Sequence, residues 1–185
     1  AVAAVPPRGE TWLLEALAPK AIDRVEECLA SGMLSSGPEG VVFRHELARL
    51  AIEESLPSDR RINLHRIALG ALANPPTGSS DLARLSHHAE AASDAEAVLR
   101  FAPEAAARAA SLGAHREAAA QYGRALRYGD RLQPSERAEF LGRRSAECYL
   151  TDDNDEAIEA QLAALACYRE LGDRRREGDS LRSLS

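Results

Sequence analysis

The chain has 185 residues, enough for one large domain or two small ones, and its 23 basic and 29 acidic residues give a net charge of −6. Only 4% of the residues are aromatic and the 45% that are hydrophobic are rich in alanine, which suits closely packed helices and argues against a β-sandwich. The acidic balance argues against binding to a phosphate backbone, and no apolar run approaches the length of a membrane span.

Two short helices are predicted near the start of the chain. The first covers residues 10–18 and ends at Pro19, because the residue before a proline is disfavoured in a helix. The second covers residues 20–31, where Ile22 begins a series of apolar residues at helical spacing, and it ends at Gly32.

A small β-hairpin is predicted over residues 33–44. This segment combines a turn rich in glycine and proline with a β-branched and aromatic run, the usual signal for two short paired strands. A third helix then covers residues 45–56. Its spacing predicts that Leu47, Leu50 and Ala51 face the core.

The clearest domain boundary lies at residues 74–80, a run of proline, glycine and small polar residues. Before this boundary, a further helix can be capped by Ser58 or Asp59. The order of two helices, a hairpin and further helices predicts a winged-helix-like domain over residues 1–73. Residues 74–80 form a linker, and residues 81–185 form helical repeats that resemble tetratricopeptide (TPR) repeats, truncated at the C-terminus. Helices are predicted at about 81–92, 95–112, 115–129, 135–151, 154–171 and 175–184.

Two stretches of the second part repeat each other. Residues 113–126 align with residues 152–165 at a constant offset of 39 positions, so that Ala118 falls on Ala157. Each copy is a polar turn followed by a helix with small residues seven positions apart, a spacing that lets a second helix lie close. Helical hairpins that recur at roughly 34 to 40 residues indicate a stacked solenoid. The fold class is therefore mainly α, a winged-helix-like domain with a small β-hairpin followed by a TPR-like α-solenoid, which favours binding over catalysis.

Four segments occur in a specific order: Phe43-Arg-His-Glu-Leu-Ala-Arg-Leu-Ala51, Leu56-Pro-Ser-Asp-Arg-Arg61, Leu64-His-Arg66 and Leu85-Ser-His-His-Ala89. In this order they resemble the middle of the large LuxR-type transcriptional regulators with an AAA-like ATPase, which are signal-transduction ATPases related to the maltose regulator MalT. The family implies the order ATPase, winged helix, helical repeats and C-terminal helix-turn-helix. This chain would hold the second and third parts, as a piece of a longer protein.

The resemblance implies a regulatory and protein-interaction segment of a bacterial, cytoplasmic transcriptional regulator. It would couple nucleotide state to the sensing of a small-molecule inducer or partner protein, and to self-assembly. The alternative is a stand-alone TPR adaptor that binds a partner protein. The sequence contains no GxxxxGK[ST] loop. We therefore expect no enzymatic activity and no cofactor in this part of the chain, ATP or ADP only in the full-length protein, and DNA binding only through a further C-terminal domain.

Two residues at the predicted junction of the hairpin and the third helix are candidate nucleotide contacts. In related signal-transduction ATPases a histidine at the end of the winged helix touches the phosphates of ADP, and the resemblance implies this role for His45, assisted by Arg44, in the full protein only. A helix start offers free N–H groups to an anion, and an imidazole adds a donor. The alternative is a histidine that bonds within the turn or to a neighbouring carboxylate.

The repeat helices supply four candidate partner-binding residues. Most tyrosines of the repeat helices are expected to pack between hairpins, with one or two in the concave groove. The candidates for the groove are Tyr122, Arg124, Arg127 and Arg143, and periodicity leaves open which side the arginines face.

No metal site is predicted from the histidines and cysteines. His87 and His88 are adjacent, so on a helix they are expected to point away from each other, and His115 lies elsewhere in the chain. The sequence has no HxxxH, HExxH or CxxC spacing. The three cysteines are expected to be small buried hydrophobes in a reducing compartment.

Overall fold

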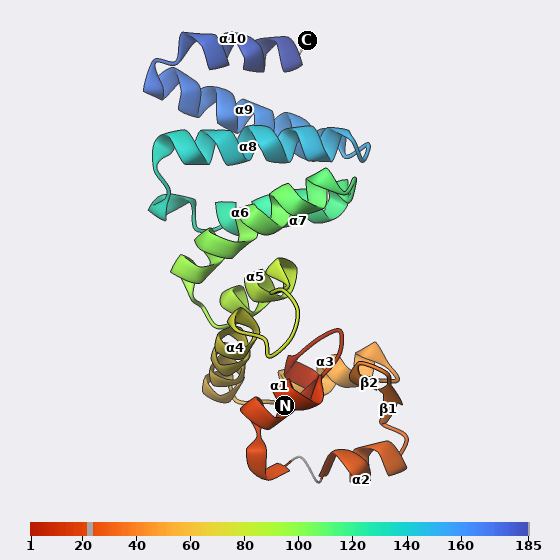
Figure 1. Cartoon of the computed structure of the whole chain (residues 1–185). Helices are drawn as coiled ribbons and strands as arrows, with labels where there is room; N and C mark the ends of the chain where they lie inside the picture. Colours follow the sequence, from red (N-terminus) through yellow and green to blue (C-terminus); the bar gives the residue numbers. More distant parts are fainter. Residues whose placement is uncertain (22–23, 185) are drawn as a thin grey trace. The chain divides into compact units, whose positions relative to one another are not determined.

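The computed structural model describes residues 1–21 and 24–184. The chain forms two compact units, Ala1–Asp94 and Ala95–Ser185, here called the first and second unit. The described residues form ten α-helices and one antiparallel pair of strands, which confirms the mainly α class (Figure 1). Within these ranges, none of the helices is both long and apolar enough to cross a membrane.

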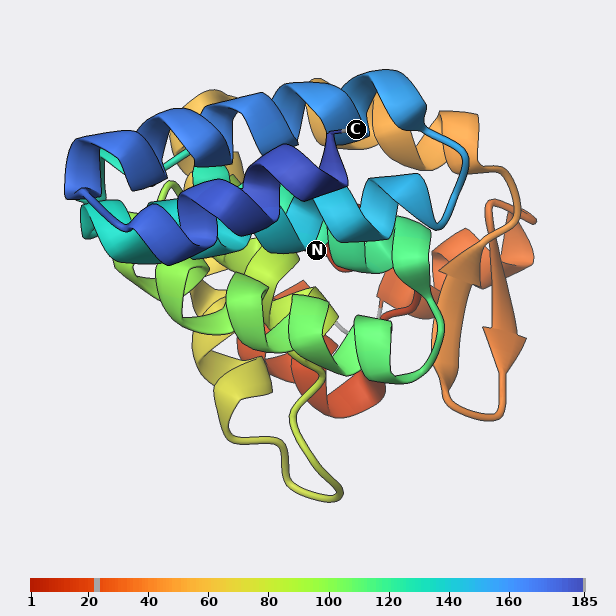
Figure 2. The same cartoon turned by 90° about the horizontal axis from the view of Figure 1, so that it is seen from above.

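The described residues of the first unit form five α-helices and the hairpin: α1 (Thr11–Leu17), α2 (Arg24–Ala30), β1 (Leu34–Gly37), β2 (Gly40–Phe43), α3 (Glu46–Glu54), α4 (Ser58–Ala73) and α5 (Leu82–Ala91). The predicted hairpin is confirmed, with Leu34 opposite Phe43 (Figure 2). Ile22 of the predicted helix over residues 20–31 lies outside the described residues. The predicted linker at residues 74–80 lies inside this unit, because α5 packs on α4 across it.

The hairpin is joined to the N-terminal segment by a short backbone bridge. The N–H of Gly9 donates to the carbonyl of Val41 at 2.8 Å, and the N–H of Val41 donates back at 3.0 Å. Gly40, at φ +138°, passes so close that a β-carbon there would lie 2.5 Å from the carbonyl oxygen of Gly9. Only glycine therefore fits at this crossing.

Helix α3 presents a different face to the core from the predicted one. Leu47 is 82% exposed and Leu50 is 37% exposed, whereas Arg49 is only 8% exposed. The Arg49 guanidinium donates to the Glu46 and Glu53 carboxylates of its own helix and, at 2.7 Å, to the backbone carbonyl of Ala3. The expected inner face was wrong because these acceptors satisfy a buried arginine.

The start of α4 also differs from the prediction. Pro57 occupies the N-cap position, and Ser58 and Asp59 are the first helical residues, so neither side chain caps the helix. At α5 a side chain does cap the helix, because the Asp81 carboxylate accepts from the N–H groups of Ala83 and Arg84.

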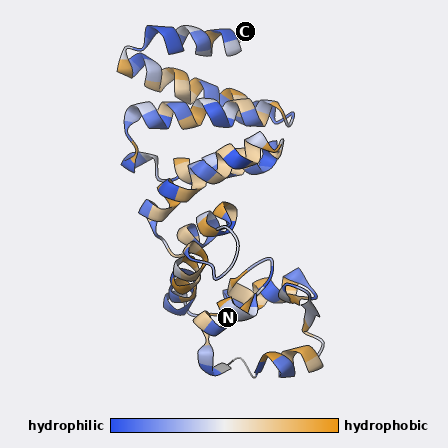
Figure 3. Cartoon of the chain, viewed as in Figure 1, coloured by the Kyte–Doolittle hydropathy of each residue, from blue (hydrophilic) through white to orange (hydrophobic). Residues whose placement is uncertain are grey.

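In the second unit, residues 95–184 form five α-helices: α6 (Ala95–Ser111), α7 (His115–Leu126), α8 (Pro134–Tyr149), α9 (Asn154–Leu171) and α10 (Arg174–Ser183). Each helix packs against the next one in the sequence, which gives the layered stack in Figure 1. The last helix, α10, is mostly hydrophilic (Figure 3), and among its described residues only Ser180 is buried.

Alanine fills the interior of the second unit. Ala118 is completely buried, and Ala157 on the aligned copy is 5% exposed, so the small residues of the repeat are core residues in both copies. Close approach lets side chains bond across helices. The Ser145 hydroxyl donates to the carbonyl of Ala157 at 2.8 Å, and the Tyr168 hydroxyl donates to the carbonyl of Ala138 at 3.2 Å.

The cysteines fit their predicted role as small core residues in part. Cys148 is buried, Cys28 and Cys167 are half-buried, and all three are free thiols. Burial raises the pKa of the Cys148 thiol, which keeps it protonated and unreactive.

Candidate functional site

A polar groove of about 660 Å³ lies in the second unit, on α7, α8 and the start of α9. We call it the arginine groove. Its lining residues are Arg116, Ala119, Ala120, Gly123, Arg124, Arg127, Arg144, Cys148, Thr151, Asp152, Asp153 and Glu156.

One face of α7 forms a whole wall of the groove. Its six lining residues follow the spacing of three and four that places side chains on the same side of a helix. The opposite face of α7 is buried and includes Ala118, Gln121, Tyr122 and Ala125. The packing residues of α7 therefore lie on one side of the helix, and the arginines that line the groove lie on the other.

A glycine makes room for the arginine that α8 contributes. At Gly123 a β-carbon would lie 3.4 Å from Nε of Arg144, so the guanidinium lies directly against the α7 backbone. Arg144 also donates to the carboxylate of Glu156 on α9. This ion pair fixes the arginine between the three helices that form the groove.

Charge is separated across the arginine groove. Two arginines lie on α7, a third, Arg127, is its C-cap, and a fourth lies on α8. Asp152 and Asp153 lie at the turn from α8 to α9, and Glu156 lies in the first turn of α9. Arg116 and Arg127 are exposed, and Arg124 donates to the side-chain oxygen of Gln121 at 2.8 Å. The arrangement suits a ligand with carboxylates facing α7 and a positive group facing the α8–α9 turn.

Two of the four predicted partner-binding residues, Arg124 and Arg127, line the groove, and the other two do not. Tyr122 is 2% exposed and belongs to the buried face of α7. Its hydroxyl accepts a hydrogen bond from Arg143 at 3.3 Å, and Arg143 is also paired with Glu139 at 2.6 Å.

His45 and Arg44 lie where the sequence predicted them, between β2 and α3, and both are exposed. His45 occupies the N-cap position of α3, but its side chain makes no capping hydrogen bond. The backbone N–H of Arg44 donates to the carbonyl of Met33 at 3.2 Å, which holds this junction against the hairpin.

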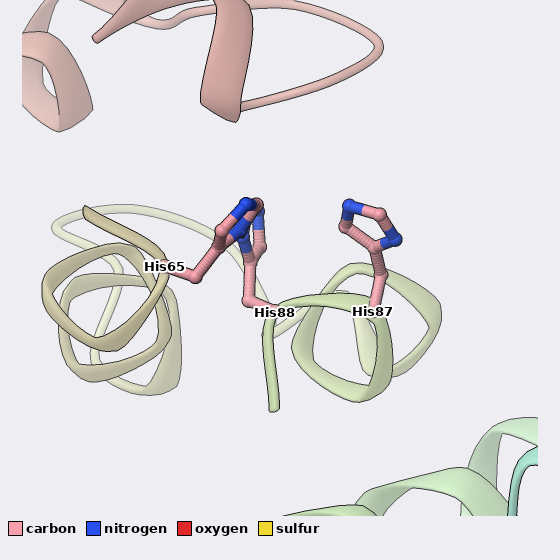
Figure 4. A group of neighbouring side chains, drawn as sticks. All are labelled: His65, His87 and His88. Carbon is pink, nitrogen blue, oxygen red and sulfur yellow. The ribbon is translucent and has the colours of Figure 1, made fainter. Parts of the chain in front are cut away.

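The structure also brings His65, which the sequence did not single out as a candidate ligand, together with the adjacent His87 and His88. His65 on α4 and His87 and His88 on α5 each offer a ring nitrogen within 4.8 Å of the others (Figure 4). The rings of His87 and His88 lie 5.2 Å apart, so the expectation that they point away from each other was wrong. Neighbouring positions on a helix are about 100° apart, which still allows both rings to reach the same side.

The fifth histidine, His115, lies in the second unit, where its Nδ1 is 2.7 Å from a carboxylate oxygen of Glu147.

Comparisons of the chain with protein-family models, with curated proteins and with solved structures found no match.

Proposed function

We propose that this chain is a regulatory, protein-interaction segment whose arginine groove binds an acidic peptide segment of a partner protein. The observation that carries the proposal is the single face of α7, which places Arg116, Arg124 and Arg127 along one wall of an open groove. Arginine is well suited to this task because its planar guanidinium binds carboxylates through two parallel hydrogen bonds.

The groove favours a peptide over a compact apolar ligand. Pockets for drug-sized molecules are mainly apolar with a few polar groups, whereas seven of the twelve residues that line this groove carry a charge. The wall of α7 runs for three turns, from Arg116 to Arg127, which matches an extended segment with several acidic side chains.

The finer fold assignments belong to the same proposal. The order of helices and an antiparallel hairpin in residues 1–73 supports a winged-helix-like domain, and the stacked helices with a 39-residue offset support TPR-like repeats. We propose that both are parts of an ATP-dependent LuxR-type transcriptional regulator, in which the winged helix couples nucleotide state to the repeats and His45 and Arg44 contact ADP.

Fluorescence anisotropy with labelled peptides tests the groove. An aspartate- and glutamate-rich peptide should bind, and the double variant Arg124→Ala, Arg127→Ala should bind about tenfold more weakly, because each ion pair at the protein surface contributes up to about 1 kcal/mol. Arg175→Ala on α10, which is exposed and lies outside the groove, is the matched control and should leave binding unchanged. Equal binding of a lysine-rich peptide, or equal loss in the control, would refute the proposal.

The assignment to an ATPase regulator has its own test. A reading frame continuous with this sequence should encode a GxxxxGK[ST] loop upstream and a basic helix-turn-helix downstream. A frame that encodes neither would favour the alternative, a stand-alone TPR adaptor, in which the groove would have the same ligand but no link to a nucleotide.

A further inference from the structure

The three clustered histidines of the first unit form a separate candidate site. His65 lies on α4, and His87 and His88 lie on α5, and in Figure 4 all three imidazoles project to the same side of the two helices. Among the described residues, this is the one group of histidine, cysteine or acidic side chains whose geometry suits a metal ion. His65 and His88 are completely buried, and His87 is half-buried.

The hydrogen bonds of His65 determine where its proton lies. Its Nε2 is 3.1 Å from Oε1 of Glu53, and because a carboxylate only accepts, Nε2 carries the proton and Nδ1 carries a lone pair. A carboxylate behind a histidine in this way is the usual partner of a metal-bound imidazole, because it fixes both the tautomer and the ring orientation.

The same reasoning leaves His88 with a buried lone pair. Its Nδ1 is 2.9 Å from Nδ1 of His65, and since that atom of His65 has no proton, His88 must donate from Nδ1. Nε2 of His88 then has a lone pair, and this atom is buried with no hydrogen-bond partner among the described residues. A buried acceptor without a donor is costly, and a bound cation would satisfy it.

The charge around the cluster is compatible with a cation. Burial lowers the pKa of His65 and of His88, so both rings are neutral at pH 7, which is the form that ligates a metal. Three arginines act on the charge of His65 or His88, and two of them are paired with carboxylates, Arg49 with Glu46 and Glu53, and Arg84 with Glu10 at 2.5 Å. The third is Arg61.

We propose that His65, His87 and His88 bind one divalent transition-metal ion of the zinc type, with a fourth coordination position left for water or an external ligand. Zinc binds imidazole nitrogens at about 2.0 to 2.1 Å in a tetrahedral arrangement, which places the ligand atoms about 3.3 Å apart. One nitrogen of each residue lies within 4.8 Å of the others, so rotation of the imidazoles brings the ligand atoms to this spacing and replaces the hydrogen bond from His88 to His65 by bonds to the metal. Rotation of the half-buried His87 side chain brings its ring nitrogen to the same distance from the other two ligand nitrogens. No net proton is released, because each neutral imidazole already offers one lone pair.

Untagged protein stripped with a chelator and titrated with Zn²⁺ and Co²⁺ tests the site. We expect one saturable ion per chain, with the visible absorption bands of tetrahedral Co²⁺ and a rise in the melting temperature of the first unit with Zn²⁺. His87→Ala should weaken binding at least about tenfold, and it should still fold because His87 is only half-buried.

Two controls separate a specific site from incidental binding to imidazole. His45→Ala removes an exposed histidine of the same unit and should leave affinity and the Co²⁺ spectrum unchanged. His65→Gln should abolish the tetrahedral bands, and circular dichroism checks that this variant is folded. Absence of saturable binding in the unmodified chain, or equal losses in His45→Ala and His87→Ala, would overturn the proposal.

Discussion

Acidification should destabilise the first unit through His88. This side chain is completely buried, and burial, with smaller contributions from the charges of His87 and His65, lowers its pKa from 6.5 to about 2. In the unfolded chain the same imidazole takes up a proton near its ordinary pKa. Below that pH the unfolded state binds more protons than the folded state, so the free energy of unfolding falls as the pH falls.

The size of this effect follows from the two pKa values. Each pH unit below the unfolded pKa of 6.5 lowers the free energy of unfolding by about 1.4 kcal/mol. Between about pH 8 and about pH 5, the burial of His88 therefore lowers the free energy of unfolding by about 2 kcal/mol. His65 acts in the same direction, because burial also lowers its pKa. The stability that depends on these two histidines being neutral is fully present above about pH 7 and is lost progressively below pH 6.5.

Urea unfolding followed by tryptophan fluorescence measures this loss in the correct unit. Trp12 is the single tryptophan of the chain and lies on α1, which packs against α4, the helix that carries His65. The titration is carried out with a chelator present, so that protons alone are varied. His88→Gln keeps an N–H that can donate to His65 but removes the titrating ring. The variant should therefore lose about 2 kcal/mol less than the unmodified chain over this pH range. An identical pH dependence in both proteins would refute the reasoning.

Three further outcomes are expected from substitutions. Ala164→Leu should destabilise the second unit by about 1 to 3 kcal/mol because Ala164 is completely buried between helices. Ala166→Leu, on the exposed side of α9, should have little effect, and thermal melts by circular dichroism measure both variants. Tyr168→Phe should cost about 1 kcal/mol in chemical denaturation by loss of one buried hydrogen bond, and Tyr149→Phe, which is 69% exposed, should cost nothing measurable. Arg49→Ala should destabilise the first unit by about 3 kcal/mol, since it leaves buried acceptors without a donor, and an unchanged urea midpoint of the tryptophan signal would contradict this role.

The helices were largely predictable from local signals. Asp81 caps α5, and Gly172 ends α9 in the left-handed conformation at φ +69°, as glycine does at many helix ends. The alanine spacing of the repeat likewise identified buried positions such as Ala118 and Ala157. These features depend on residues a few positions apart, which a single sequence displays directly.

The inner face of α3 could not be found in this way. Periodicity favours Leu47 over Arg49 as a core residue, but the choice is made by the backbone carbonyl of Ala3, which lies 46 positions away in the sequence. A similar limit applies to Tyr122, because an aromatic side chain fits equally well in a groove and in a helix interface.

The histidine cluster was missed because residues 74–80 were interpreted as a boundary between domains. As a loop between two packed helices, the same segment brings His65 and His88 together. His65 lies eight residues before the end of α4 at residue 73, and His88 lies six residues after the start of α5 at residue 82. Nearly equal distances from the connecting loop were the signal that could have indicated their contact.

At position 123, selection for stability and selection for ligand binding favour different residues. Glycine in a helix costs roughly 1 kcal/mol relative to alanine, so mutation to alanine should be favoured wherever stability alone is selected. Here the added methyl group would lie 3.4 Å from Nε of Arg144, a van der Waals contact that restricts how this side chain can move to meet a ligand. A variant selected for heat resistance could thus gain stability at Gly123 and lose ligand affinity, and retention of glycine during such selection would indicate that binding, and not folding, limits the fitness of this chain.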